Sequence, residues 1–169
     1  LNSAQLTQLT KAAFTFKEGQ GGGCAHASVN KELIGKDASV LAQAAGVNVL
    51  ADTQLLFAET DANHPFVQEE QMMPMLPIVR VKSVEEGIAL SLQSEHGYKH
   101  TAIIHSHDVE NITAMARTLD TTLFVKNGPS PAGLGLGGEG YLSFSIATPT
   151  GRPRATPTDW LARSTGLRS

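Results

Sequence analysis

The chain has 169 residues, of which 41% are hydrophobic and 17% are charged, and its net charge is −3. A chain of this length supports one domain with a real core, since it buries roughly 70% of its unfolded surface. The weak negative charge gives no electrostatic case for a nucleic-acid partner or an anionic membrane. No apolar run approaches the roughly 18 residues that a membrane-spanning helix needs.

The single cysteine, Cys24, excludes an internal disulfide and suits a reducing compartment. No secretory signal is visible. We therefore expect a cytoplasmic protein. The chain begins at Leu1 and not at a methionine, so we expect a processed chain or, better, a piece of something longer.

The first part of the chain predicts two helices separated by a glycine-rich break. Residues 3–14 indicate a helix with Ser3 as its N-cap, because their apolar side chains share one face. Those side chains belong to Leu6, Leu9 and Ala13. Residues 19–23 include four glycines and cannot hold a regular element. Residues 37–45 predict a short helix capped by Asp37, with a glycine just past its end.

From residue 54 onward, short β-type runs alternate with helical ones. Strands are predicted at residues 54–58, 76–82, 101–105, 121–126 and 141–148. Ser83 and Glu86 form a capping box that opens a helix to about Glu95, and Asp108 caps a helix that runs to residue 119. The order from 76 to 126 is β-α-β-α-β, which predicts an α/β fold with a mostly parallel sheet and flanking helices.

Ligands of such sheets sit beyond the carboxyl ends of the strands. That rule points to residues 106–108 and 127–131 as site loops. Residues 127–140 as a whole predict a Gly/Pro-rich loop. The tail from Pro149 onward carries three prolines and no clear period, so we assign it no structure.

The stretch from Glu69 to Val81 begins acidic and ends as an apolar, β-type run. Because Pro74 and Pro77 cannot sit inside a central strand or a helix, we expect a shaped loop that becomes regular only after Pro77. Such a loop, leading into a buried strand, can present a side chain to a ligand. It can equally be a stiff connection.

Cys24 is the only candidate thiol nucleophile in the chain. A catalytic cysteine needs a nearby base or cationic neighbours, and His26 would face another way in an extended segment. Because Cys24 sits in a glycine run and not on a rigid element, we do not assign it as catalytic.

The histidines invite a metal hypothesis. His105 and His107 form an H-x-H pair that is followed by Asp108. Zinc needs three or four ligands from a fixed scaffold, whereas His107 already lies in the turn and Asp108 is better explained as the helix cap. We therefore predict no metal site.

Two further motifs lie in the loop after the last parallel strand. Gly133 to Gly140 contains G-x-G-x-x-G, but a dinucleotide-binding turn needs a strand immediately before it and a helix immediately after it. A mobile loop or a close backbone crossing fits better. Asn127 and Ser130 could bind a carbonyl or a phosphate, or serve as ordinary turn residues.

Four segments together resemble a known family. They are HPFVQEEQMMPMLPIVRV, GYKHTAIIHS, TTLFVKNGPS and GLGGEGYLSFSIATPTG, in this order. The chain resembles the CoA-acylating aldehyde dehydrogenases, above all the propionaldehyde and acetaldehyde dehydrogenases of propanediol and ethanolamine utilisation in bacterial microcompartments. The resemblance runs from about residue 30 to residue 151, with a weaker extension back to Leu1.

The resemblance implies a reaction of aldehyde, CoA and NAD to give acyl-CoA and NADH, through a cysteine thioester. The family's nucleophilic cysteine lies upstream of the matched segment, so the resemblance implies a C-terminal part of the catalytic region without its nucleophile. Glu70 matches a glutamate that binds the nicotinamide ribose, and Met72 would pack beside the nicotinamide. His100 matches a histidine near the catalytic thiolate, where it could act as a base toward CoA.

The aldehyde pocket is the third site that the resemblance implies. Asn127, Pro129 and Ser130 match the loop that lines this pocket. Pro131 stands where the family usually has an aromatic residue, which changes the shape of the pocket. These assignments predict a small aldehyde substrate.

The resemblance also divides the chain. Residues 1–150 would be a partial catalytic domain, and residues 151–169 a non-matching, disordered tail. In the family the corresponding tail forms an oligomerisation strand, which the prolines here do not suit. The expected partners are the aldehyde, the rest of the parent chain and possibly a second copy of the protein, in the cytoplasm or a microcompartment lumen.

Three hypotheses follow. The first is a portion of an NAD-dependent, CoA-acylating aldehyde dehydrogenase that is inactive alone. The second is a non-catalytic ligand-binding or assembly module that keeps the fold. The third is a metal-dependent hydrolase that uses His105, His107 and Asp108.

Overall fold

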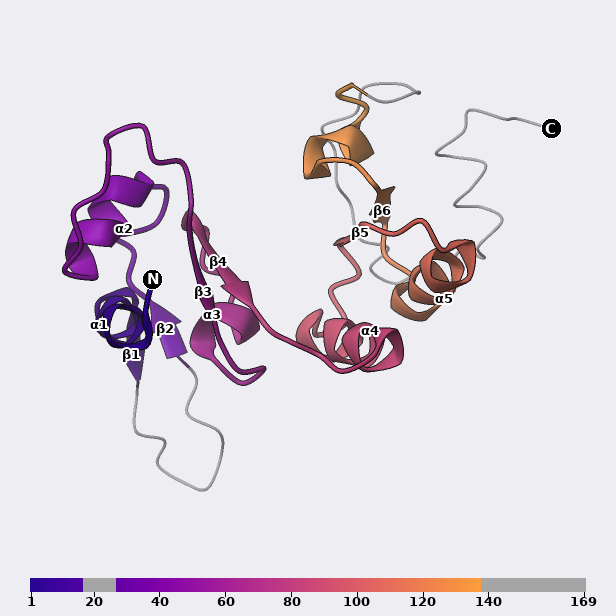
Figure 1. Cartoon of the computed structure of the whole chain (residues 1–169), viewed down its shortest axis with the longest axis horizontal. Helices are drawn as coiled ribbons and strands as arrows, with labels where there is room; N and C mark the ends of the chain where they lie inside the picture. Colours follow the sequence, from indigo (N-terminus) through magenta and orange to yellow (C-terminus); the bar gives the residue numbers. More distant parts are fainter. Residues whose placement is uncertain (17–26, 138–169) are drawn as a thin grey trace. The chain divides into compact units, whose positions relative to one another are not determined.

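The computed structural model describes residues 1–16 and 27–137. The chain divides into two compact units, Leu1–Arg80 and Val81–Ser169. Both contain parallel strand pairs with helices beside them (Figure 1), so the predicted α/β fold class is confirmed. The predicted break at residues 19–23, the strand at 141–148 and the tail lie outside the described residues. No helix within the described ranges is long and apolar enough to cross a membrane.

The described residues of the first unit form seven elements. In chain order they are α1 (Ser3–Ala13), β1 (Phe14–Phe16), β2 (Ala27–Val29), α2 (Ala38–Ala44), β3 (Leu56–Glu59), α3 (Pro65–Gln68) and β4 (Met75–Ile78). Strand β1 pairs antiparallel with β2, and β3 pairs parallel with β4. Strands β1 and β2 and helix α3 were not predicted, because elements of three or four residues are too short to show a period.

The N-cap of α1 is Asn2, so the prediction of Ser3 was wrong by one residue. Asn2 Oδ1 accepts from the Gln5 N–H at 3.0 Å, and Gln5 Oε1 accepts from the Asn2 N–H at 2.9 Å. This reciprocal capping box satisfies two backbone donors that the helix leaves unpaired. Ser3 is consequently the first helical residue.

The core of the first unit lies between the two longer helices and the inner faces of the strands. Leu9 of α1 and Leu41 of α2 have no exposed surface, and Phe14 is also buried. Phe14 meets Phe66 of α3 edge to face, with ring centroids 4.8 Å apart. The predicted apolar face of the first helix is confirmed, since its three named residues are all buried. The short helix α3 is thus anchored to the core through Phe66.

Pro77 lies inside β4, opposite Ala58 of β3, which contradicts the expectation that the chain becomes regular only after it. The hydrogen bonds explain why the proline is tolerated. The Leu56 N–H donates to the Pro74 carbonyl, and the Thr60 N–H donates to the Ile78 carbonyl. In a parallel ladder alternate residues face the partner strand, so even-numbered residues of β4 face β3 and Pro77 turns its missing N–H away.

The second unit contains five described elements. They are α4 (Val84–Ser94), β5 (Thr101–Ile104), α5 (Val109–Leu119), β6 (Leu123–Lys126) and a 3-10 helix, η1 (Ser130–Leu134). Strands β5 and β6 pair in parallel, with Thr101 opposite Leu123 and Ile104 opposite Lys126. The predicted helices are confirmed at both positions, and η1 is an addition within the predicted loop.

Local capping fixes where both long helices of this unit begin. Asp108 accepts from the Glu110 and Asn111 N–H groups at the start of α5, as predicted. Ser83 accepts from the Glu86 N–H at the start of α4, at 3.2 Å. The Glu86 carboxylate reaches the Lys82 N–H at 2.7 Å, so the return bond goes to the residue before the cap.

Several apolar side chains of each unit are exposed. On the outward face of β3 and β4, Phe57 is 60% exposed, and Leu76 and Ile78 are exposed as well. In the second unit, the structure describes every residue of α4, and none of them is buried. Parallel strands normally have both faces covered, so these surfaces resemble those of an incomplete sheet.

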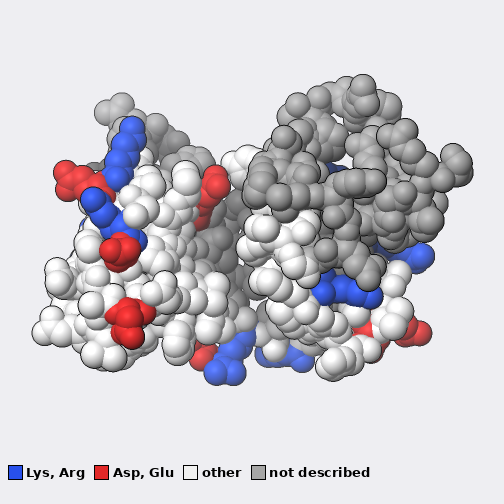
Figure 2. Space-filling view, turned by 90° about the horizontal axis from the view of Figure 1, so that it is seen from above, with Lys and Arg blue, Asp and Glu red and all other residues white. Residues whose placement is uncertain are grey.

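The charged side chains are mixed. On the face seen in Figure 2, each unit shows both basic and acidic side chains among uncharged residues. Within each unit, the described residues of that face therefore form no surface of a single sign.

Candidate functional site

Glu70 and Met72 lie on the segment that joins α3 to β4 in the first unit. Both side chains are exposed, and Met72 is 63% exposed although it is large and apolar. The backbone at Met72 has φ of 49°, in the left-handed region that non-glycine residues seldom adopt. The next residue, Met73, is buried in the core. The segment therefore presents one carboxylate and one thioether outward and anchors itself through its neighbour.

Two hydrogen bonds hold this segment at its middle. The Gln71 side-chain amide donates to the Met75 carbonyl at 2.9 Å, which ties the loop to the start of β4. The Gly35 N–H donates to the Met72 carbonyl at 3.1 Å. Because partners on both sides fix the backbone, the left-handed conformation of Met72 is imposed by the fold and not by local preference.

His64 caps the short helix that leads to this segment. Its Nδ1 accepts from the Phe66 N–H at 3.3 Å, its Nε2 lies 3.4 Å from Thr10 Oγ1, and its ring stacks on Phe66. Burial lowers the pKa of His64 from its ordinary value of 6.5, and the negative charge of Asp61 offsets part of that effect. The cap requires an unprotonated Nδ1, so the geometry and the pKa both favour the neutral ring.

Asn127 lies at the carboxyl ends of β5 and β6, as the strand-order rule predicts for a site loop. Its Oδ1 accepts from the Ser106 N–H at 2.9 Å, and its Nδ2 donates to the Ser106 carbonyl at 2.8 Å. Its own N–H donates to the Ile104 carbonyl at 2.8 Å. The side chain thus acts as a short extension of the ladder between two loops 21 residues apart. Ser106 was not predicted as its partner, because the two residues are far apart in the sequence.

Pro129 and Ser130 follow Asn127 and are both exposed, as is Pro131. Pro129 precedes η1, and Ser130 is the first residue of that helix. Gly133 allows η1 to approach β6 closely, because a Cβ there would lie 3.0 Å from Val125 Cγ2. The loop is therefore folded back on β6 and presents its proline and serine side chains to solvent.

His100 immediately precedes β5 and is exposed. Its Nδ1 lies 2.7 Å from Thr101 Oγ1, and its N–H donates to Glu95 Oε1 at 3.1 Å. Because β5 and β6 are parallel, His100 and Asn127 lie at opposite ends of the pair, separated by roughly 15 Å of strand. The structure therefore does not bring these two predicted site residues together within the second unit.

The three residues of the metal hypothesis lie near one another in sequence. His105 and His107 are both exposed, and Asp108 is engaged as the cap of α5. Within residues 1–16 and 27–137, no group of three or more histidine, cysteine, aspartate or glutamate side chains is placed to hold a metal ion. Cys24 and His26 lie outside the described residues.

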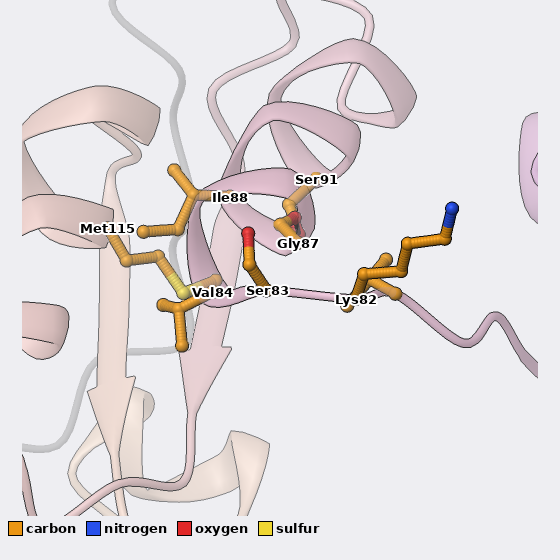
Figure 3. A pocket seen from close by; sticks show the side chains of 8 residues that line it. Lys82, Ser83, Val84, Gly87, Ile88, Ser91 and Met115 are labelled. Carbon is orange, nitrogen blue, oxygen red and sulfur yellow. Dashed lines mark hydrogen bonds between the residues drawn. The ribbon is translucent and has the colours of Figure 1, made fainter.

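A shallow hollow of about 380 Å³ lies between the start of α4 and α5. Figure 3 shows Val84, Ile88 and Met115 forming its apolar side, while Lys82 extends away from them. The hydroxyl groups of Ser83 and Ser91 already bond to the backbone of α4. The hollow is an apolar surface with one cation at its edge, and the sequence analysis did not predict it.

No family model matches the chain. Among curated proteins, the acetylating acetaldehyde dehydrogenase EutE of Salmonella typhimurium is 50% identical over 151 residues, which are 89% of this chain and 32% of that protein. The CoA-propanoylating propanal dehydrogenase of the same organism is 52% identical over 123 residues. The chain thus spans about a third of the length of the curated relatives that it matches.

Solved structures match the fold as well. Propionaldehyde dehydrogenase of Rhodopseudomonas palustris with bound propionyl-CoA matches with a TM-score of 0.78 and 44% identity, over 95% of this chain and 33% of that chain. The same enzyme has been solved with CoA and an acylated cysteine. A propionaldehyde dehydrogenase from the fucose-utilisation microcompartment of Clostridium phytofermentans also has a TM-score of 0.78, at 37% identity.

The His64 cap predicts a pH-dependent stability. Since the pKa of His64 is lower in the folded state than its ordinary 6.5, the unfolded chain binds the proton more readily, and stability should fall as pH decreases below 6.5. Urea unfolding at about pH 7.5 and about pH 5.5 measures the change. His64→Asn keeps a capping oxygen but does not titrate, so this variant should lose part of the dependence. An unchanged pH dependence in His64→Asn would refute this role.

The Asn127 hydrogen bonds predict a loss of stability on substitution, and two variants separate the effect of the bonds from that of the backbone conformation. Asn127→Ala should destabilise the second unit by about 2–4 kcal/mol, because it removes two hydrogen bonds and places an alanine, whose Cβ disfavours positive φ, in the left-handed region. Asn127→Gly loses the same bonds but accepts a φ of 52°, so it should cost less than the alanine variant. Urea unfolding gives both values, and hydrogen exchange at the Ser106 amide should quicken in both variants. A protected Ser106 amide would contradict the assignment.

Proposed function

We propose that the parent protein of this chain oxidises a small aldehyde to an acyl-CoA, because the chain belongs to the CoA-acylating aldehyde dehydrogenases. The chain spans about a third of the length of its curated relatives. The reaction is R–CHO + CoA–SH + NAD⁺ → R–CO–S–CoA + NADH + H⁺. The 50% identity to an acetylating acetaldehyde dehydrogenase over 151 residues carries this proposal. The propionyl-CoA bound to a structural neighbour with 44% identity supports it.

The proposed chemistry divides between this chain and the rest of the parent. A cysteine thiolate outside this chain adds to the aldehyde carbon, and loss of hydride from that carbon leaves a thioester. When bound, NAD supplies the acceptor for the hydride. The CoA thiol then loses its proton, its sulfur attacks the thioester carbon, and the cysteine leaves as a thiolate. Covalent catalysis thereby splits one difficult acyl transfer into two steps.

We assign the proton transfer to His100. A base toward CoA must be reachable and must present an unprotonated nitrogen. The His100 ring is exposed, and its Nδ1 is already engaged by Thr101 Oγ1. In the tautomer whose Nδ1–H donates to Thr101 Oγ1, Nε2 is unprotonated and can take the thiol proton. The relatives of known structure include an enzyme with CoA and an acylated cysteine, the state that such a base would serve.

We assign the cofactor contact to Glu70 and Met72. The exposed carboxylate of Glu70 suits two ribose hydroxyls, and the Met72 side chain offers an apolar surface for a ring. The Gly35 N–H holds the Met72 carbonyl, and the Gln71 side chain ties the same loop to Met75, which favours a preorganised pair. An engineered glycolyl-CoA reductase with bound NADP⁺ is 43% identical to this chain, which supports a nicotinamide nucleotide as the ligand.

The aldehyde pocket is assigned to the loop of Asn127, Pro129 and Ser130. Asn127 fixes the loop through Ser106, and Pro129 and Ser130 are exposed at the carboxyl ends of the strands. The exposed Pro131 gives this pocket a rigid, non-aromatic wall.

The rest of the parent chain is the proposed partner of the open apolar surfaces. Phe57, Leu76 and Ile78 on the outward face of β3 and β4 are exposed, and covering them is favourable at roughly 25 cal/mol per Å². We extend the proposal to a homo-oligomer in the cytoplasm or in the lumen of a bacterial microcompartment. The relative from a fucose-utilisation microcompartment supports that location.

The proposal predicts that the 169-residue chain is inactive by itself. Incubation with propionaldehyde, CoA and NAD⁺ should give no NADH by absorbance, because the nucleophile is absent. A full-length relative provides the positive control. NADH production by this chain alone would overturn the claim, and calorimetric binding of NAD and CoA without turnover would favour a non-catalytic module.

In the full-length parent, Glu70→Gln should weaken NAD binding by about 1–2 kcal/mol, because it removes a charge-assisted hydrogen bond to the ribose. Fluorescence titration with NAD⁺ measures the affinity. Glu69→Gln, at the end of α3, is a matched control that changes the same charge one residue away and should leave the affinity unchanged. Equal affinities of Glu70→Gln and the unmodified enzyme would remove Glu70 from the site.

A further inference from the structure

We propose that Thr101 is a positioning residue that holds the His100 ring in the orientation needed for acyl transfer to CoA. The inference rests on the proposed role of His100. It assigns a function to a hydroxyl group that neither the sequence motifs nor the strand-order rule selected. The substrate group concerned is the thiol of CoA.

The first observation is the ring contact. Thr101 Oγ1 lies 2.7 Å from His100 Nδ1, which is a short hydrogen bond for a hydroxyl and an imidazole. Thr101 is the first residue of β5 and pairs with Leu123 of β6, so its backbone is part of the strand ladder. The β-branched threonine side chain is also stiff about χ1. The hydroxyl is therefore presented from a rigid element in a restricted direction.

The second observation is that the His100 backbone is held on both sides. Its N–H donates to Glu95 Oε1 at 3.1 Å, and its carbonyl accepts from the Leu123 N–H at 3.0 Å. The other oxygen of Glu95 accepts from the Gly97 N–H at 3.0 Å, which closes the turn before β5. With its backbone engaged at both polar groups, His100 retains freedom mainly in its side-chain torsions.

The residue before His100 is pinned as well. Lys99 has φ of 52°, and its Nζ lies 2.7 Å from Asp120 Oδ2. Its carbonyl accepts from the Thr122 N–H at 2.8 Å. Lys99 thus adopts a left-handed conformation that local preference disfavours, and two contacts from the α5–β6 connection hold it there. The backbone at residues 99 and 100 is therefore held by hydrogen bonds on both sides. Thr101 is the residue that bonds to the His100 ring itself.

The chemistry explains why a hydroxyl suits this position. A hydroxyl oxygen accepts a hydrogen bond from Nδ1–H in the tautomer that leaves Nε2 unprotonated. Nε2 can then accept the CoA thiol proton while Nδ1–H keeps the same partner. Orientation of a base by a second hydrogen bond is a general requirement of such catalysis. Without the hydroxyl, the ring can rotate and either nitrogen can face the thiol.

The test uses the full-length parent enzyme and measures acyl transfer from a preformed acyl-enzyme to CoA in a single turnover. Thr101→Val is nearly isosteric and removes only the hydroxyl, so the rate of this step should fall on the order of tenfold, a fraction of what a whole general base supplies. The rate at which the acyl-enzyme forms from the aldehyde and NAD⁺ should not change. Thr101→Ser keeps the hydroxyl and should retain most of the rate.

Thr118→Val is the matched control, because Thr118 is an exposed residue of α5. It should leave the rate unchanged. Urea unfolding of all variants separates loss of the hydrogen bond from loss of the fold. A Thr101→Val enzyme with an unchanged acyl-transfer rate, or a Thr101→Ser enzyme that is as slow as Thr101→Val, would overturn the inference.

His100→Gln distinguishes this inference from the function on which it rests. If His100→Gln transfers the acyl group normally, the proposed base itself is wrong. If His100→Gln is slow and Thr101→Val is normal, only the positioning role fails. If both the base role of His100 and the positioning role of Thr101 are correct, adding Thr101→Val to His100→Gln should not slow acyl transfer any further, because the two residues act as a unit.

Discussion

The parallel pairing of β5 with β6 is the constraint on which the candidate residues of the second unit depend. Thr101 opposite Leu123 sets the register, and both ends of the pair are then extended by groups outside the strands. At the amino end, the His100 carbonyl continues the ladder. At the carboxyl end, the Asn127 side chain does so through Ser106. A slip of one residue would reverse the faces of the strands and break both extensions.

The first unit applies a comparable constraint to the proposed cofactor residues. Helix α3 has only four residues and would not be stable alone. It is held because Phe66 packs edge to face on Phe14, and because His64 caps it with a neutral ring. Glu70 follows directly, so its position depends on a core contact made far away in the sequence. The position of the Glu70 carboxylate is thus set by tertiary packing.

The open apolar surfaces and the partial match to relatives have one explanation. A chain that spans about a third of a larger protein should leave apolar strands and helix faces that other segments cover. The outward side of β3 and β4 has this character, and none of the residues of α4 is buried. Parallel strands covered on one face only are uncommon in complete domains. The open surfaces therefore agree with the proposal that other segments of a longer parent protein cover them.

The sequence by itself determined the features that arise from short-range interactions. The Asp108 cap and the apolar face of α1 follow from residues within one or two turns of each other, and the structure confirms both. Asp37 occupies the predicted N-cap position of α2, but its side chain makes no capping hydrogen bond. The order of strands and helices from residue 76 to 126 and the four family motifs are likewise properties of the linear chain. Only the tertiary structure decided which groups meet across long separations. Pro77 is accepted in β4 because the register turns its missing N–H away from β3, and Asn127 bonds to Ser106 because two parallel strands bring their loops together. The physical reason is that pairing partners are chosen by the packing of the whole unit, and no window of local sequence contains that choice.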